Sequence, residues 1–141
     1  MKTAAIILIG NEILSGKVED ANGVYAIRRF RGLGVSVRRL IVVPDTSEAI
    51  ADEVRSCSAR YDVVVTSGGV GPTHDDITLD CVAAAFDVQT YRHPVLEERI
   101  RSHFGDRLTP DHLRMATVPV NTELIEGTQI AWPVIQVRNV Y

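Results

Sequence analysis

The sequence predicts an α/β fold of three layers, in which helices cover both faces of a mostly parallel central sheet, with a small antiparallel edge near the end of the chain. Apolar runs and helical patterns alternate as strand, helix, strand, helix, strand between residues 3 and 65. The first apolar run, residues 3–9, is uninterrupted, as a strand covered on both faces requires. Because such units join parallel strands through right-handed crossovers, we expect functional loops at the carboxyl ends of the strands.

The remaining elements follow from apolar residues at helical or strand spacing and from the turn-forming residues between them. Val24, Ile27 and Phe30, for example, recur at helical spacing and predict the first helix. After it we expect a strand at 35–43, a helix that Asp45 or Ser47 caps, and a strand at 61–65. Three helices should follow: one at 78–86 capped by Thr78, one from Pro94 to Phe104, and a short one after Pro110. A hairpin or edge strand from 124 should then lead into a last strand at 134–141.

Size and composition limit the kind of protein this is. The 141 residues have the usual length of one domain, so we treat 1–141 as a single domain. A net charge of -3 disfavours a partner bound through nucleic-acid phosphates. Cys57 and Cys81 lack zinc-ligand spacing, and the run 3–9 is too short to cross a membrane. We therefore expect a cytoplasmic protein that binds a small molecule and engages neither nucleic acid nor membrane.

The strongest local motif joins the strand at 61–65 to the next helix, and it reads Thr66-Ser67-Gly68-Gly69-Val70-Gly71-Pro72-Thr73-His74-Asp75-Asp76-Ile77-Thr78. Its glycines let the backbone approach a ligand and point N–H groups at it, which suits a phosphate. The alternative is a tight turn whose glycines only adopt positive φ angles. His74 replaces the third glycine of a dinucleotide-binding fingerprint, and the only lysines are Lys2 and Lys17, so neither a Rossmann motif nor a P-loop is present.

Two adjacent carboxylates, Asp75 and Asp76, end this glycine loop. They would repel a phosphate unless a divalent cation lay between, or unless they bound hydroxyl and amino groups of the ligand. The alternative is that one of them, Asp75 in particular, caps the following helix. The candidate ligand-binding residues of the glycine loop are Thr66, Ser67, Gly68, Gly69, Gly71, Thr73 and Asp75, with Asp76 as a candidate metal ligand.

A second polar loop follows the first strand directly. Its carboxylates and glycines suit a metal ion or the hydroxyl groups of a ligand. The alternative is a solvated loop in which Asn22 caps the first helix. The candidate ligand-binding residues are Gly10, Asn11, Glu12, Ser15, Gly16, Asp20 and Asn22.

Asp45 stands where the second strand ends, and it is the third candidate. Glu48 follows at the spacing of a capping box, which favours a structural role. However, the strand exits at residues 9, 43 and 66 all deliver carboxylates or glycines to one edge, where open α/β sheets bind ligands. We therefore expect the three loops to converge on one pocket.

These loops, in this order, resemble the molybdopterin-binding domain found in MogA, MoaB, gephyrin and CinA proteins. The segment Ile9-Gly10-Asn11-Glu12-Ile13-Leu14-Ser15-Gly16, with Asp20 and Asn22, is similar to the opening loop of CinA-type proteins, and 66–76 is similar to their glycine loop. The resemblance continues through Arg114-Met115-Ala116 to Asn139-Val140-Tyr141, and it is nearest to the N-terminal domain of CinA, the competence/damage-inducible protein A. Relatives continue into a Pro-Gly-x-Pro loop that completes the pocket, so we expect a domain truncated before that loop.

The resemblance implies a ligand and a chemistry. In the molybdenum-cofactor enzymes it implies binding of molybdopterin and its adenylylation with magnesium and ATP, with two aspartates that match Asp45 and Asp76 as catalytic and Mg²⁺-binding residues. In CinA-type proteins it implies hydrolysis of the pyrophosphate bond of ADP-ribose. Three hypotheses result: a molybdopterin-binding domain of molybdenum cofactor biosynthesis, a metal-dependent nucleotide pyrophosphatase, and a non-catalytic oligomeric scaffold. The resemblance also implies a homo-oligomer, either a dimer or a trimer.

Overall fold

The computed structural model describes all residues from Met1 to Tyr141. The strands are β1 (Thr3–Ile9), β2 (Ser36–Val43), β3 (Val63–Ser67), β4 (Thr90–Arg92), β5 (Thr117–Pro119), β6 (Glu123–Ile125) and β7 (Val134–Gln136). The helices are α1 (Asn11–Leu14), α2 (Asn22–Gly32), α3 (Ser47–Arg60), α4 (Thr78–Ala85), α5 (Pro94–Phe104) and α6 (Pro110–Leu113), with 3-10 turns η1 (Gly105–Arg107) and η2 (Arg114–Ala116). None of the helices is both long and apolar enough to span a bilayer.

The main sheet has three parallel strands in the order β2-β1-β3. β1 lies in the middle and pairs along its whole length with β2, from Thr3 opposite Ser36 to Ile9 opposite Val43. Its residues from Ala4 to Ile9 are almost completely buried. The apolar run is continuous because β1 is a central strand that is buried on both faces, as predicted.

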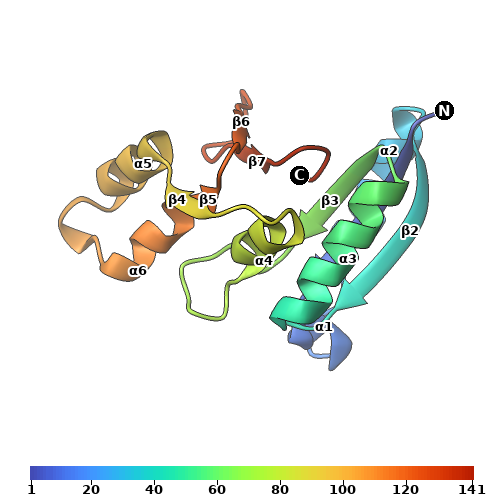
Figure 1. The fold of residues 1–141 in the computed structure, drawn as a ribbon, viewed down its shortest axis with the longest axis horizontal. Helices are drawn as coiled ribbons and strands as arrows, with labels where there is room; N and C mark the ends of the chain where they lie inside the picture. Colours follow the sequence, from blue (N-terminus) through green and yellow to red (C-terminus); the bar gives the residue numbers. More distant parts are fainter.

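Helices cover both faces of this sheet, which confirms the predicted three-layer arrangement. Alternate β1 residues, such as Ile7, join Ile50 and Val54 of α3 and Val82 of α4 in the larger core cluster. On the opposite face α2 packs on β1 and β2. In Figure 1, α3 runs along the near side of the sheet, with α4 beside it. The parallel strands consequently end together at one edge.

The elements from β4 to β7 form a smaller lobe on the other side of α4 (Figure 1). There, α5, α6 and η2 pack around a separate apolar cluster beside the antiparallel pair β4 and β5. Its buried members are Leu96, Ile100, Leu113, Ala116 and Val118. The cavity described below lies where this lobe meets α4.

The predicted antiparallel edge near the end of the chain is present as the hairpin of β6 and β7, but the last strand is shorter than expected. β7 stops at Gln136, because Arg138 adopts a positive φ of 54° and Val137 and Val140 exchange two backbone hydrogen bonds of 2.9 Å. After this turn Val140 forms a parallel bridge to Val64 of β3. The chain therefore ends beside the free edge of the main sheet.

The helix caps proposed from sequence in the first lobe are wrong. The residues preceding α2, α3 and α4 are Ala21, Thr46 and Ile77, and none of them caps its helix through a side-chain hydrogen bond. The side chains expected to cap these helices therefore make other contacts or none; they are those of Asn22, Asp45, Ser47, Asp75 and Thr78. Three of them, Asn22, Asp45 and Thr78, form hydrogen bonds to the strand-exit loops, which are described with the site below.

Candidate functional site

The three strand exits meet at one edge, as predicted. The Gly10 N–H donates to the Val43 carbonyl over 3.1 Å, which joins the exits of β1 and β2. On the other side of β1, the Ile9 carbonyl lies against Gly68, directly after β3. Loops from three distant parts of the chain thus form one rim at the carboxyl ends of the strands, where open α/β sheets bind ligands.

Asp45 binds the loop after β1 instead of capping a helix. Its Oδ2 accepts from the Asn11 N–H over 3.1 Å, and its own N–H donates to Asn11 Oδ1 over 3.1 Å. This reciprocal pair leaves Asp45 Oδ1 without a hydrogen bond inside the protein. Asp45 is therefore held at the rim with one oxygen available to a ligand.

Asn22 also joins two loops. Its Nδ2 donates to Ser67 Oγ over 2.9 Å, which connects the start of α2 to the end of β3. Asp20, not Asn22, accepts from a first-turn N–H of α2, since its Oδ1 lies 2.8 Å from the Gly23 nitrogen. The interpretation of Asn22 as a helix cap is thus wrong, and the side chain instead braces the rim.

The other residues predicted from the opening loop lie on the outside of α1. Glu12 is exposed, and its carboxylate folds back over Gly10. Ser15 and Gly16 end the short helix and are exposed as well. None of these residues lines the cavity described below.

The glycine loop leaves β3 in a left-handed conformation that only glycine adopts without strain. The φ angles are 105° at Gly68 and 67° at Gly69. A Cβ atom on Gly68 would collide with the Ile9 carbonyl, and one on Gly69 with the Thr78 hydroxyl. The tight-turn interpretation therefore explains these two glycines, and the turn places Gly69 and the next residues along the cavity.

Thr78 holds this turn in place from the interior. Its side chain is fully buried and donates to the Gly68 carbonyl over 2.8 Å, while its N–H donates to the Gly69 carbonyl over 3.1 Å. A buried carbonyl without a partner would cost about 1 to 3 kcal/mol, so these bonds stabilise the loop. Thr78 is the first residue of α4 and anchors the loop to that helix.

Asp76 folds back onto its own loop. Its Oδ2 accepts from the Thr73 N–H over 3.0 Å and from Thr73 Oγ1 over 2.7 Å. Partial burial opposes ionisation, but the bonds from Thr73 and from the Gly71 N–H, with the positive charge of Arg114, outweigh it and lower the pKa of Asp76 below its usual value. Asp76 is therefore a carboxylate anion at neutral pH.

Asp75 behaves differently from its neighbour. Its side chain is exposed and lies 3.3 Å from His74 Nε2, and it forms no cap on α4. The structure thus separates the two adjacent acids that the sequence presents together, because only Asp76 lines the cavity.

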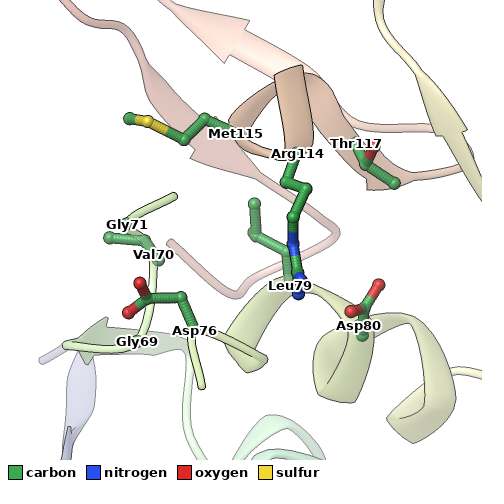
Figure 2. A pocket seen from close by; sticks show the side chains of 9 residues that line it. All are labelled: Gly69, Val70, Gly71, Asp76, Leu79, Asp80, Arg114, Met115 and Thr117. Atoms are coloured by element: carbon green, nitrogen blue, oxygen red, sulfur yellow. The ribbon is translucent and has the colours of Figure 1, made fainter. Parts of the chain in front are cut away.

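A cavity of about 110 Å³ lies between the glycine loop, α4 and the smaller lobe. Figure 2 shows Arg114 extending from η2 toward Asp80, with Asp76 on the opposite side near Gly71. Sequence reasoning did not select Arg114 as a site residue, because it follows the glycine loop by some forty positions and carries no motif spacing of its own. The lining residues are Gly69, Val70, Gly71, Asp76, Leu79, Asp80, Arg114, Met115 and Thr117.

The chain does not form a metal site from its side chains alone. No three His, Cys, Asp or Glu side chains gather so that they could hold an ion. Asp45 and Asp76 lie on opposite sides of the β1 exit, and Asp45 Oδ1 accepts no hydrogen bond within the protein. Magnesium is commonly held by one or two carboxylates together with substrate phosphates and water, so these residues fit an ion that enters with a ligand.

Comparison with known proteins identifies the family. A family model described as a probable molybdopterin binding domain matches residues 5–137, so the chain belongs to that family. Within the family it is a CinA-like domain. The structure of the protein CinA of unknown function from Thermoplasma acidophilum superimposes with a TM-score of 0.87 and 33% identity, over 95% of this chain and 80% of that one.

Sequence relatives are much longer than this chain. A CinA-like protein of Anaeromyxobacter sp. (strain K) is 41% identical over 124 residues, which cover 85% of this chain and 30% of the relative. A probable FAD synthase of Caenorhabditis briggsae is 36% identical over 161 aligned positions, which cover 99% of this chain and 31% of the relative. The chain thus spans less than a third of either protein.

The fold is shared with molybdenum-cofactor proteins. The molybdopterin biosynthesis enzyme MoaB of Thermus thermophilus superimposes with a TM-score of 0.54 and 23% identity, over 80% of this chain and 70% of that one. A structure of MogA gives a TM-score of 0.55 and 25% identity. This confirms the predicted α/β architecture.

We predict that Gly68→Ala destabilises the protein by at least about 3 kcal/mol, because alanine would combine an unfavourable positive φ with a clash against the Ile9 carbonyl. Gly32→Ala is the matched control, since a Cβ at Gly32 would meet no atom within 4 Å. It should change the free energy of unfolding by no more than about 1 kcal/mol. Urea denaturation followed by circular dichroism measures both, and equal stabilities would contradict the close approach of β1 and the glycine loop.

Proposed function

We propose that this domain binds molybdopterin, a pterin that bears a phosphate, as a CinA-type binding domain with a role in molybdenum cofactor biosynthesis. The observation that carries the proposal is the cavity between the glycine loop and η2, which sets backbone N–H groups beside an ionised Asp76. The N–H groups suit the phosphate oxygens. Asp76 suits the amino group and ring N–H groups of a pterin, or a Mg²⁺ ion.

The rim extends this site beyond the cavity. A cavity of about 110 Å³ is much smaller than the roughly 300 to 1,000 Å³ of a typical ligand pocket, so most of the ligand would lie outside it. The surface around Asp45 and Asn11, at the exits of β1 and β2, is the adjoining part of the same edge. We propose that the two aspartates act on one ligand from opposite sides of the β1 exit.

We predict that Asp76→Asn weakens molybdopterin binding at least tenfold, since asparagine can still accept from Thr73 but carries no charge. Asp75→Asn is the matched control, because Asp75 is exposed and does not line the cavity. It should change affinity less than threefold. Isothermal titration calorimetry with and without MgCl₂ measures both variants. Unchanged affinity in Asp76→Asn would reject the proposed ligand site.

A second candidate is a metal-dependent nucleotide pyrophosphatase. The observation in its favour is the similarity to a probable FAD synthase, since FAD contains a pyrophosphate bond. Water would attack one phosphorus of ADP-ribose, the bridging P–O bond would break, and AMP and ribose 5-phosphate would leave. A bound Mg²⁺ would stabilise the charge on the phosphate oxygens. Asp45, with its free oxygen, would accept the proton of the attacking water.

The same residues would also serve adenylyl transfer. In that reaction the molybdopterin phosphate would attack the α-phosphorus of ATP, and pyrophosphate would leave. We propose this reaction as the alternative chemistry of the site, because it needs the same two carboxylates and the same phosphate contacts.

For the pyrophosphatase we predict release of AMP from ADP-ribose in the presence of Mg²⁺ or Co²⁺, and at least a hundredfold slower release by Asp45→Asn. Chromatography of the nucleotides measures the product. Glu48→Gln is the control, because Glu48 is exposed in the first turn of α3 and makes no hydrogen bond or ion pair with the strand-exit loops. The full-length protein should be assayed alongside, and absence of AMP from both preparations would exclude this candidate.

A third candidate is a non-catalytic scaffold that self-associates. Large apolar side chains are exposed on α1, α2 and β2 and directly after α2, and α1 and α2 both pack on β2. Among them, Leu33 and Tyr25 are 72% and 66% exposed. Such surfaces commonly mark protein interfaces. The other exposed members are Leu14, Val24 and Leu40.

We propose that the chain forms a homo-oligomer through this surface, and we expect Leu33→Asp to shift a dimer or trimer toward monomer. Val120→Asp is the control, because Val120 is exposed on the smaller lobe. Sedimentation equilibrium measures the molar mass. A monomer in the unmodified protein at micromolar concentration would refute self-association.

A further inference from the structure

The cavity beside the glycine loop has walls from both lobes. Gly69, Val70 and Gly71 form one wall, and Arg114 and Met115 of η2 form the other. η2 belongs to the smaller lobe, whose apolar cluster includes Ala116 directly after Met115. A ligand in this cavity would therefore contact residues whose positions are set by two separate cores.

Arg114 is a half-buried cation that forms no salt bridge. Other arginines of the smaller lobe do form them: Arg99 pairs with Glu126 at 2.6 Å and Arg101 pairs with Glu97 at 3.0 Å. In Figure 2 the Arg114 side chain extends into the space above α4, between Asp76 and Asp80. Asp80 is exposed to water and Asp76 is hydrogen-bonded to Thr73, so neither neutralises the guanidinium by direct contact.

The facing wall offers further donors. The backbone N–H groups of Gly69 and Val70 donate to no acceptor in the protein. Asp76 also lines the cavity, but its Oδ2 is bound within the loop by Thr73. A guanidinium on one side and backbone N–H groups on the other form a set of donors that matches a phosphate group, which guanidinium groups bind through two parallel hydrogen bonds.

The size of the cavity agrees with this chemistry. Its volume of about 110 Å³ has room for a small anion together with water. A phosphate group would fit this space, and the rest of a nucleotide or pterin would extend beyond it. Leu79 and Met115 add apolar side chains to the lining of this space.

We propose that Arg114 is the phosphate-recognition residue of this domain and that the ligand's phosphate binds between Arg114 and the backbone of Gly69 and Val70. The proposal rests on the proposed function of the same site and adds the residue that selects for the anion. It also makes the ligand a bridge between the two lobes, because η2 and the glycine loop would hold the same group.

The test uses inorganic phosphate and pyrophosphate as probes, with calorimetry on the full chain. Arg114→Gln should raise the dissociation constant of the probes at least tenfold. Arg114→Lys, which keeps the charge but not the planar fork, should restore part of the affinity. Arg101→Gln is the matched control, since Arg101 lies in the same lobe and outside the cavity, and it should bind as the unmodified protein does. If Arg114→Gln loses more affinity for pyrophosphate than for phosphate, the site binds a bridging phosphate. If it loses affinity for both probes equally, the site binds a phosphate monoester.

Wild-type affinity for both probes in Arg114→Gln would overturn this inference and leave the molybdopterin site to its own test at Asp76. An equal loss in Arg101→Gln would also overturn it, because the effect would then reflect general surface charge. Failure of the unmodified protein to bind either probe would overturn both the inference and a phosphate site at the glycine loop. Circular dichroism melts of each variant separate lost binding from lost folding, and Arg114→Lys carries the test if the glutamine variant is unfolded.

Discussion

The close contact between the end of β1 and the turn after β3 is the constraint on which the site depends. The Ile9 carbonyl occupies the place where any side chain at Gly68 would begin. Two successive residues with positive φ, Gly68 and Gly69, lead the chain past this carbonyl. The Thr78 hydroxyl then binds the Gly68 carbonyl and holds the turn against α4. This contact sets the path of the glycine loop and thereby places the loop N–H groups and Asp76 along the cavity.

Around this contact, polar side chains connect loops that are distant in sequence. Asp45 and Asn11 hold the exits of β1 and β2 together, and Asn22 reaches Ser67 at the end of β3. Helix caps built from these side chains would have stabilised each helix locally. Bonds between loops stabilise the rim as one unit, which a binding site needs if its groups are to be ordered before the ligand arrives.

The two aspartates expected to act together have different surroundings. Asp76 is partly buried and bound by Thr73, and its pKa lies below the usual value. Asp45 shares its bonds with Asn11 at the opposite side of the β1 exit. The proposed site would then have a narrow part, the cavity with Arg114, and an open part, the rim with Asp45. A ligand with a compact anionic end and a broad, flat remainder would suit both parts.

The sequence by itself determined the parallel sheet, its two covering layers and the edge where the loops meet, because the spacing of apolar residues along each segment reflects which of its faces is buried. It also marked Gly68, Asp45 and Asp76, since strand exits in such sheets are adjacent by topology. Only the tertiary structure decided which acid turns inward, that Asn22 and Asp45 join loops instead of capping helices, and that Arg114 lies across from Gly69. The bonds of Asn22 and Asp45 join residues 45 and 34 positions apart, and the place of Arg114 depends on how the smaller lobe packs against α4. No local pattern in the chain encodes these contacts.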